Sequence, residues 1–326
     1  LNSVLKQSLK DIEVICVDDG STDRSPQILK KYEMTESRVR VIRQQNRYAG
    51  AARNRGLEEA VGTYVVFWDS DDLFDREALE KLYQKCEQDQ ADVAICRARR
   101  LDNASGEIYS SGIYLVRKRL PKGVPFDKAK AGKYLFNITT NVPWNKMYRR
   151  EFIRENHLAF QEIRQANDTY FTMLALFYAK RITVVDRCLV TYREGNPKSL
   201  TGKASDSRFC ILDAYRAVYQ VLQKDPGFNE ELRQSFANKA LDSLLYSLRT
   251  QWNVQSFKEL FDTYKADAFE EFGILHQEKA YFYSEEQADD LEQMMVWDAE
   301  QFLLYLFRKY ERQYQLLNGN YLVRGQ

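Results

Sequence analysis

The chain has 326 residues, which is long enough for one large domain and a second, smaller one. Its 48 Lys and Arg residues nearly balance 47 Asp and Glu residues, and this near-neutral charge argues against nucleic acid as a partner. Only two histidines occur, which argues against a Ser-His-Asp triad or a His-rich metal centre, so carboxylates, a metal or both must supply any chemistry.

The chain begins with Leu1 in a pattern typical of a helix interior, so we expect an N-terminal piece to precede it. No apolar run reaches the roughly 20 residues that a bilayer-spanning helix needs. The five cysteines are scattered and form no CxxC pair, which is typical of free thiols in a reducing cytosol. We therefore expect a cytoplasmic location.

Two short apolar runs each end in a cluster of aspartates. Residues 12–17 (IEVICV) run into DDGSTD at 18–23, and residues 63–68 (TYVVFW) run into DSDD at 69–72. Both runs are typical of buried strands of a parallel sheet, because they are rich in β-branched and aromatic residues. Ligands of such sheets bind beyond the carboxyl ends of the strands, where two carboxylate clusters would repel each other without a cation or a hydroxyl-rich ligand. The pattern therefore predicts a site for a divalent metal and a nucleotide.

The segments between and after these runs alternate between helix and strand patterns. This alternation predicts a doubly wound, mostly parallel α/β sheet. Helices are expected over 25–32, with Ser25 as the cap, over 50–59 and over 76–89, and strands are expected over 38–43 and 92–97.

The pattern changes after residue 101. Residues 102–132 are irregular and predict an insertion or a mobile loop. Helical patterns return at 144–156 and 168–179, and an edge strand is expected over 181–192.

Beyond residue 205 the pattern is almost purely helical. It predicts an α/β domain over 1–204, which carries the expected nucleotide site, and an all-helical domain over 205–326. A bundle core with a solvated face explains the aromatic stripes and basic residues of these helices, while self-association and docking on a membrane are left open. The basic residues concerned are Arg308, Lys309 and Arg312.

The DSDD segment is the strongest candidate for a metal site. Asp69 and Asp71 are spaced by one residue in a turn, so both can face one cation or one ribose, and oxygen ligands suit Mg²⁺ or Mn²⁺. A turn that caps the helix over 76–89 is the structural alternative, although Asp72 alone could provide that cap. The DDGSTD segment has a similar alternative as a strand-to-helix turn. Paired with DSDD, it predicts a loop that recognises a base and a ribose.

Residues 50–56 (GAARNRG) begin a helix with small residues. Small residues permit close backbone approach, and Arg53 near a helix N-terminus could meet a phosphate. Tight packing of the helix on the sheet explains the small residues equally well.

These segments, in this order and at this spacing, resemble glycosyltransferase family 2, and the resemblance covers roughly residues 1–200. The motifs concerned are VDDGSTD, Asn46 followed by GAARNRG, Gly62-Thr63-Tyr64 before DSDD, and PWNKMYRREF at 143–152. The resemblance implies the glycosyltransferase A-type fold and a bacterial polysaccharide or capsule-type transferase. We expect the first strand of that fold and its turn to precede this sequence.

The resemblance also implies roles for individual residues. Asp18 or Asp19 would contact the nucleobase, Asp69 the ribose or a metal, and Asp71 the metal. Further candidates for binding the nucleotide-sugar are Asn46, Arg53 and Arg193, the last in a loop where Lys198 is the alternative partner of the diphosphate.

The family carries a Glu-Asp pair whose Asp is the catalytic base. The matching pair here is Asn167-Asp168, in which the Asp is kept and the Glu is replaced by a residue that can still form hydrogen bonds. Asp168 is therefore the predicted general base, and Glu162 is the fallback candidate. The alternative role for Asp168 is the N-cap of the helix over 169–179.

The resemblance and the residues together predict an inverting, metal-dependent, hexosyltransferase-type glycosyltransferase with Mn²⁺ or Mg²⁺ as its cofactor. It would move a sugar from a nucleotide-sugar, expected to be a UDP-sugar, to a hydroxyl of a glycan or lipid-linked acceptor. The acceptor implied by the resemblance is a growing bacterial cell-surface polysaccharide. A homo-oligomer formed through the C-terminal helices and peripheral attachment to the inner face of the cell membrane are left open.

Three other functions are weighed against this one. A haloacid dehalogenase-type phosphatase would use Asp69 as nucleophile and needs a second acidic pair, for which the sequence offers Asp289-Asp290 in a helical stretch. A sugar nucleotidyltransferase shares the broad fold but would release pyrophosphate. A degenerate, non-catalytic scaffold of a polysaccharide-assembly complex is the third, and Asn167 is the residue that points to it.

Overall fold

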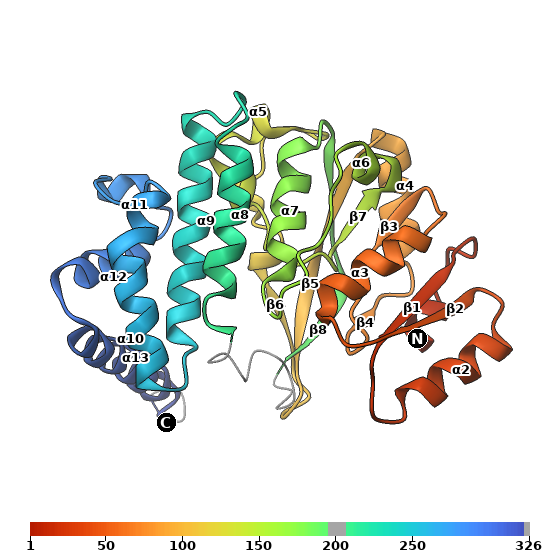
Figure 1. Cartoon of the computed structure of the whole chain (residues 1–326), viewed down its shortest axis with the longest axis horizontal. Helices are drawn as coiled ribbons and strands as arrows, with labels where there is room; N and C mark the ends of the chain where they lie inside the picture. Colours follow the sequence, from red (N-terminus) through yellow and green to blue (C-terminus); the bar gives the residue numbers. More distant parts are fainter. Residues whose placement is uncertain (195–206, 323–326) are drawn as a thin grey trace. The chain divides into compact units, whose positions relative to one another are not determined.

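The computed structural model describes residues 1–194 and 207–322, and it describes side chains up to residue 311. The chain divides into two compact units (Figure 1). The first contains the described residues up to 194 together with Cys210–Lys239, and the second contains 207–209 and the residues from Ala240 onward. The predicted boundary at residue 205 lies outside the described residues, and the contacts group Cys210–Lys239 with the first unit. The exact limits of the domains stay a prediction.

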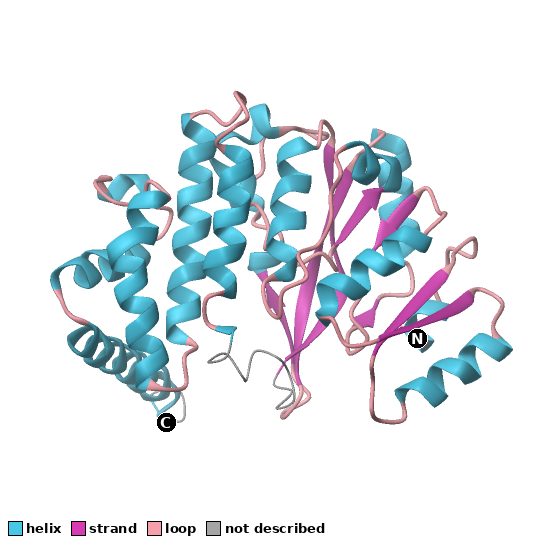
Figure 2. Cartoon of the chain, in the orientation of Figure 1, coloured by secondary structure: helices cyan, strands magenta, loops and turns pink. Residues whose placement is uncertain are grey.

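The first unit contains two sheets, drawn in magenta in Figure 2. In the smaller sheet, β1 (Val14–Asp19) pairs in parallel with β2 (Val39–Gln44). The larger sheet has the strand order β3-β7-β5-β8-β4, and β6 pairs with β5. Its strands are β3 (Tyr64–Val66), β4 (Leu73–Phe74), β5 (Val93–Asp102), β6 (Ile108–Ser111), β7 (Lys146–Arg149) and β8 (Ile182–Glu194).

The larger sheet is mixed and not mostly parallel as predicted. Only the pairing of β5 with β8 is parallel in this sheet, and its other described pairings are antiparallel. The segment 144–156, expected to be helical, forms β7 and then α6 (Arg150–Glu155). Four residues are too few for periodicity to separate a strand from a helix, and pairing with both β3 and β5 decides the outcome. The strand over 181–192 is likewise not at an edge, because β8 lies between β5 and β4.

Helices flank these sheets, and the α/β class is confirmed. Helix α2 begins at Ser25, so Ser25 is its first residue and Arg24 is the N-cap. The irregular segment 102–132 contains β6, α5 and short 3₁₀ turns between loops. The helices of this unit are α1 (Asn2–Leu5), α2 (Ser25–Thr35), α3 (Tyr48–Glu59), α4 (Ala78–Asp89), α5 (Lys128–Ala131), α6, α7 (Asn167–Tyr178) and α8 (Cys210–Leu222), and α9 (Glu230–Arg249) contributes its first part.

Aromatic packing in the core sets the position of α7. Phe171 of α7 is fully buried and its ring contacts those of Phe67, Tyr148 and Phe160 at centroid distances of 5.4, 5.1 and 4.1 Å. Such pairs add specific geometry to ordinary apolar burial. Because Phe67 follows β3 directly and precedes the DSDD segment, this cluster ties the start of α7 to the end of β3.

The second unit is helical. Its Asp290 is fully buried and bound by Arg249, Tyr305 and Lys309, and Asp289 pairs with Lys279 on the surface. Both aspartates are therefore parts of structural ion pairs within helices, which removes the second acidic pair that a phosphatase would need. The helices are the remainder of α9, α10 (Val254–Thr263), a π-helical turn (Tyr264–Ala268), α11 (Phe269–Glu271), α12 (Glu285–Val296) and α13 (Ala299–Leu322).

None of the helices in the described part of the chain combines the length and the apolar character that crossing a bilayer requires.

Candidate functional site

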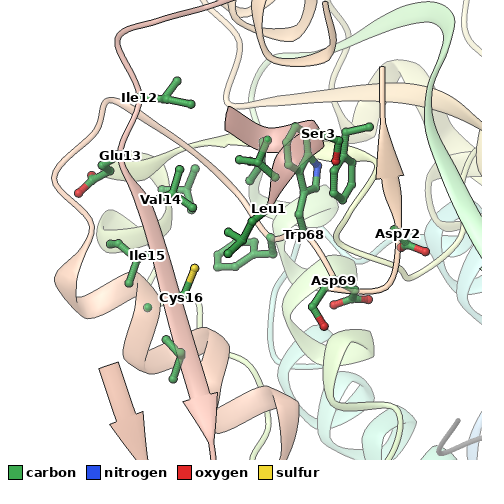
Figure 3. A pocket seen from close by; sticks show the side chains of 18 of the residues that line it. Leu1, Ser3, Ile12, Glu13, Val14, Ile15, Cys16, Trp68, Asp69 and Asp72 are labelled. Atoms are coloured by element: carbon green, nitrogen blue, oxygen red, sulfur yellow. The ribbon is translucent and has the colours of Figure 1, made fainter. Parts of the chain in front are cut away.

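A cavity of about 1650 Å³ lies between β1 and β3 in the first unit. Figure 3 shows side chains of β1, from Val14 to Cys16, near Leu1 and Trp68, with Asp69 and Asp72 further along. The same cavity is lined at its polar end by Asp18, Asp19, Arg53, Asp69, Asp71, Asp72 and Arg193. The two aspartate clusters are thus brought to one cavity, although β1 and β3 belong to different sheets.

Asp18 ends β1 as a buried carboxylate. It is 4% exposed, and its Oδ1 accepts a hydrogen bond of 3.0 Å from the backbone N–H of Ser21. Its Oδ2 lies 3.4 Å from Nε of Arg43 on the neighbouring strand. These contacts close the turn after β1 and hold Asp18 in place, so its carboxylate supports the turn as well as lining the cavity.

Asp19 is held by the residues after β2. Its Oδ1 accepts hydrogen bonds from the side chain of Gln44 at 2.8 Å and from the backbone N–H of Arg47 at 2.9 Å. Gly20 follows with φ of 78°, and a Cβ there would lie 3.0 Å from the backbone nitrogen of Asn46. Asn46 therefore packs against the DDG turn, which places it beside Asp19 but not among the residues that line the cavity.

Arg53 joins the two sides of the site. One terminal nitrogen donates to Asp69 Oδ1 and the other to Asn167 Oδ1, each at 2.7 Å, and the guanidinium lies 5.4 Å from the ring centre of Phe160. Burial alone would lower the pKa of Arg53, but the charges of Asp69 and Asp168 raise it. Arg53 is in the second turn of α3 and not at its N-terminus, so its position differs from that of a helix-end phosphate ligand.

The DSDD segment forms a tight carboxylate turn. Asp72 is 5% exposed, and its Oδ1 accepts a hydrogen bond of 3.0 Å from the backbone N–H of Arg193, whose Nε donates to the Asp71 carbonyl at 3.2 Å. Burial raises the pKa of Asp72 to about 7; the Arg193 N–H opposes this shift, and the charges of Asp69 and Asp71 add to it.

Asp72 is a site residue that the sequence reasoning assigned elsewhere. It does not cap a helix, because α4 begins at Ala78 with Glu77 as N-cap. Among the described residues, its buried Oδ2 has no hydrogen-bond partner. The sequence did contain a signal for this residue, since Asp72 is the third carboxylate of DSDD. A role as helix cap accounted for Asp72 without any ligand, so it was not assigned to the site.

The donor set of this turn fits a divalent ion. In the parts of the chain with described side chains, no group of three or more His, Cys, Asp or Glu residues is already arranged around one point. Mg²⁺ is commonly bound by one or two carboxylates, with substrate phosphates and waters completing its shell. Asp69 and Asp71 offer two carboxylates, and the orphaned Oδ2 of Asp72 lies in the same turn. The set therefore suits an ion that arrives with a diphosphate better than one held by protein alone.

Asp168 lies in the first turn of α7. The N-cap of this helix is Ala166, with φ of 56°, so Asp168 does not cap it. The Asp168 carboxyl is partly exposed, and removal from water raises its pKa, while Arg53 and Lys146 act to lower it and Asp69 to raise it. Asn167 is buried and bonded to Arg53. The fallback candidate Glu162 is exposed and ion-paired with Arg47.

Close packing places α3 against the segment before Asp168. A Cβ at Gly50 would lie 1.9 Å from the carbonyl oxygen of Gln161 and 3.1 Å from Cβ of Asn167. The glycine is therefore required by packing, which confirms the packing explanation at this position. Lys198 and the neighbouring residues 199–201 lie outside the described residues, so only Arg193 of that loop is placed.

Comparison with known proteins supports one family. The model of glycosyl transferase family 2 matches residues 1–156. The chain is 33% identical over 268 residues to the putative glycosyltransferase EpsH of Bacillus subtilis (strain 168), an alignment that covers 80% of this chain and 75% of EpsH. It is 34% identical over 205 residues to the uncharacterized glycosyltransferase EpsJ of the same organism, which covers 62% of this chain and only 58% of the length of EpsJ.

Among solved structures, the fold is similar to that of S. aureus TarS, residues 1–349, in complex with UDP-GlcNAc. The TM-score is 0.67, and the superposition covers 92% of this chain and 84% of that chain. Sequence identity is 21%, so this likeness concerns the fold.

Proposed function

Since this chain belongs to glycosyltransferase family 2 and has the glycosyltransferase A-type fold, we propose that it transfers a sugar from a nucleotide-sugar to a hydroxyl group of an acceptor. One observation carries the proposal. The carboxylates at the end of β1 and after β3 line one cavity, and Arg53 connects that cavity to the residue beside Asp168. On this proposal, the cavity would bind the donor, and Arg53 would link it to the candidate base.

The donor is proposed to bind through its nucleotide at the polar end of the cavity. Asp18 or Asp19 would accept hydrogen bonds from the base, and Asp69 would contact the ribose or a metal. Asn46 would act by supporting the DDG turn. Arg193, which donates hydrogen bonds to Asp71 and Asp72, would contact the diphosphate. UDP is the favoured nucleotide, in line with the UDP-GlcNAc held by the structurally similar TarS.

A divalent ion, Mn²⁺ or Mg²⁺, is proposed to bind with the donor at Asp71 and Asp69. When bound, it would neutralise the negative charge that develops on the departing diphosphate. The chain's own contribution is to present the carboxylates together and to bury Asp72; this burial raises the pKa of Asp72 to about 7, and the charges of Asp69 and Asp71 add less to the shift.

Asp168 is proposed as the general base. It would take the proton from the acceptor hydroxyl while that oxygen attacks the anomeric carbon from the face opposite the diphosphate. One displacement of this kind inverts the anomeric centre. Because removal from water raises the pKa of Asp168, its carboxylate is a stronger base than an exposed aspartate. The acceptor is proposed to be a growing glycan of the bacterial cell surface.

A donor screen tests this proposal. The protein is incubated with Mn²⁺ and a panel of UDP-, GDP- and dTDP-sugars, and the nucleotide product is identified by chromatography. Release of a nucleoside diphosphate from one donor is expected. A parallel incubation with UTP and a sugar 1-phosphate would release pyrophosphate if the protein were a nucleotidyltransferase instead. The absence of both binding and turnover for every donor would favour a non-catalytic scaffold.

A further inference from the structure

A buried lysine holds the loop that precedes β7. Lys146, the first residue of β7, is fully buried. Its Nζ donates to the carbonyls of Thr140 at 2.9 Å and Val142 at 2.7 Å, and to Oδ1 of Asn145 at 2.8 Å. We call residues 139–145 the bridging loop. All three acceptors are satisfied at once only by the charged ammonium, with its three N–H groups, which is the form that Lys146 takes below its pKa.

A second ammonium and a buried amide fix the rest of the bridging loop. Nζ of Lys239, on α9, donates to the carbonyl of Thr139 at 3.0 Å. The side-chain nitrogen of Asn145, which is fully buried, donates to the carbonyls of Cys96 at 2.8 Å and Tyr114 at 3.0 Å. The carbonyls of Thr139, Thr140 and Val142 are thus held by ammonium groups from within the protein, so the loop has little freedom to shift.

The bridging loop touches the neighbours of the proposed base. The side-chain nitrogen of Asn141 lies 3.5 Å from Oγ1 of Thr169, the residue after Asp168, and donates to the hydroxyl of Tyr215 at 3.0 Å. The N-terminal half of the bridging loop is therefore in contact with the start of α7, beside Asp168.

The other end touches the neighbours of the carboxylate turn. Nε1 of Trp68, the residue before Asp69, donates to the carbonyl of Trp144 at 3.1 Å. The ring of Trp144 stacks on that of Tyr192, the residue before Arg193, with a centroid distance of 5.6 Å. A shift of the bridging loop would therefore displace neighbours of both Asp168, the proposed base, and the DSDD turn.

Lys146 has no carboxylate partner to justify its burial. In the part of the chain that the structure describes, no Asp or Glu forms an ion pair with its ammonium. Burial lowers the pKa of Lys146 to about 7; Lys239 lowers it further, and Cys96 and Asp168 raise it. A buried, unpaired charge is costly, and an apolar side chain would fill the same space without that cost. Retention of a charge there points to a use beyond packing.

We propose that Lys146 is a positioning residue for glycosyl transfer: its ammonium fixes the bridging loop between Asp168 and the DSDD turn and supplies positive charge that favours the carboxylate form of Asp168. This inference rests on the proposed function. Each of the two charges favours the other, since the Lys146 charge lowers the pKa of Asp168 and the Asp168 charge raises the pKa of Lys146.

Other charged or titratable groups also shift the pKa values of Lys146 and Asp168. Asp168 also faces Arg53 and Asp69, and Lys146 also faces Lys239 and Cys96. Burial raises the pKa of Cys96 to about 12, so this thiol stays neutral in the working range. A change in the acidic limb of the pH profile that appears only when Lys146 loses its charge is therefore assigned to the Lys146–Asp168 pair.

The test compares two uncharged substitutions in the full chain. Lys146→Met keeps the length but donates no hydrogen bond, and Lys146→Gln loses the charge but keeps two donors. In both, the acidic limb of kcat/KM is expected to move to higher pH, because Asp168 loses a favourable charge. The kcat of Lys146→Met should fall at least about tenfold, with a smaller loss for Lys146→Gln, and the donor Kd should change less than about threefold.

Lys309→Met is the matched control. Lys309 is also largely buried, but its ion pairs with Glu286 and Asp290 lie wholly within the second unit. The acidic limb of the kcat/KM profile of Lys309→Met should stay at the wild-type pH. If both Lys146 variants keep the wild-type limb while the wild type transfers sugar, this inference is overturned and the proposed function stands. If the wild type transfers no sugar from any donor, both are overturned. Should Lys146→Met fail to fold, the limb of Lys146→Gln decides.

Discussion

Arg53 lies 2.7 Å from Asp69 and holds that carboxylate in a partly buried ion pair. The same guanidinium reaches Asn167 on the far side, so one side chain connects the turn after β3 with the start of α7. This contact gives a structural role to Asn167, at the position where the resemblance to the family implies a Glu. The amide oxygen of Asn167 accepts the hydrogen bond from Arg53 without adding a negative charge beside Asp168.

Substitution of Arg53 should impair donor binding and transfer together. Arg53→Lys keeps the charge, but a single ammonium cannot reproduce the planar fork that reaches Asp69 and Asn167 at once. We expect kcat/KM for the donor to fall at least about tenfold, which corresponds to about 1.4 kcal/mol. Arg55→Lys is the control, since Arg55 pairs with Glu58 and Glu59 on the surface. Equal activity of the two variants would contradict this role.

Removal of a carboxylate that is proposed to bind the metal should abolish the metal-dependent binding of UDP. For Asp71→Ala, calorimetry with UDP in the presence of Mn²⁺ is expected to show no binding, because the carboxylate is proposed to hold the ion that bridges to the diphosphate. The wild type titrated with UDP and a chelator should resemble the variant. Binding of UDP and Mn²⁺ by the variant with wild-type affinity would show that the ion is held elsewhere.

The contact of α3 with the segment before Asp168 predicts opposite results for two glycines of one helix. Gly50→Ala should destabilise the fold by about 1–3 kcal/mol, because its Cβ would meet the backbone of Gln161 at 1.9 Å. At Gly56 an added Cβ meets only Val17 at an ordinary 3.5 Å. Gly56→Ala should therefore be neutral or stabilising by up to about 1 kcal/mol, from helix propensity. Denaturant unfolding measures both, and a stable Gly50→Ala would contradict the close approach.

The predictions that succeeded from sequence rest on local patterns. The aspartates after residues 17 and 68 were expected at strand ends because apolar runs stop there, and the structure brings them to one cavity. What local patterns could not give are contacts between distant segments. Arg53 and Asn167 are 114 residues apart, and no periodicity links them.

The mixed sheet has the same explanation. The four residues of β7 become a strand because β3 and β5 offer edges on both sides, which is a property of the assembled sheet. Asp72 was explained by a local helix cap, whereas its actual partner is the backbone of Arg193, 121 residues away. Lys146 was not singled out from the sequence, because it lies among other polar residues of a segment expected to be helical, and no local pattern shows that its side chain is buried.

Burial of Lys146 predicts a specific dependence of stability on pH. Its pKa falls from 10.5 to about 7 on folding, so between these values the unfolded chain binds a proton that the folded chain does not. The free energy of unfolding of the wild type, relative to that of Lys146→Met, should therefore rise as the pH increases from 7 to 10.5. Urea unfolding across this range measures the difference. A difference that is constant or falls with pH would show that Lys146 keeps its proton in the fold.

The most direct test of the proposed reaction compares wild type and Asp168→Asn with the donor identified by the screen. The substitution keeps the size of the side chain but removes its ability to accept a proton. We predict that the variant binds UDP and Mn²⁺ like the wild type while transfer falls about 10²- to 10⁴-fold. Glu162→Gln, altered at the exposed fallback candidate, should retain activity. Wild-type rates of transfer by Asp168→Asn would contradict the account.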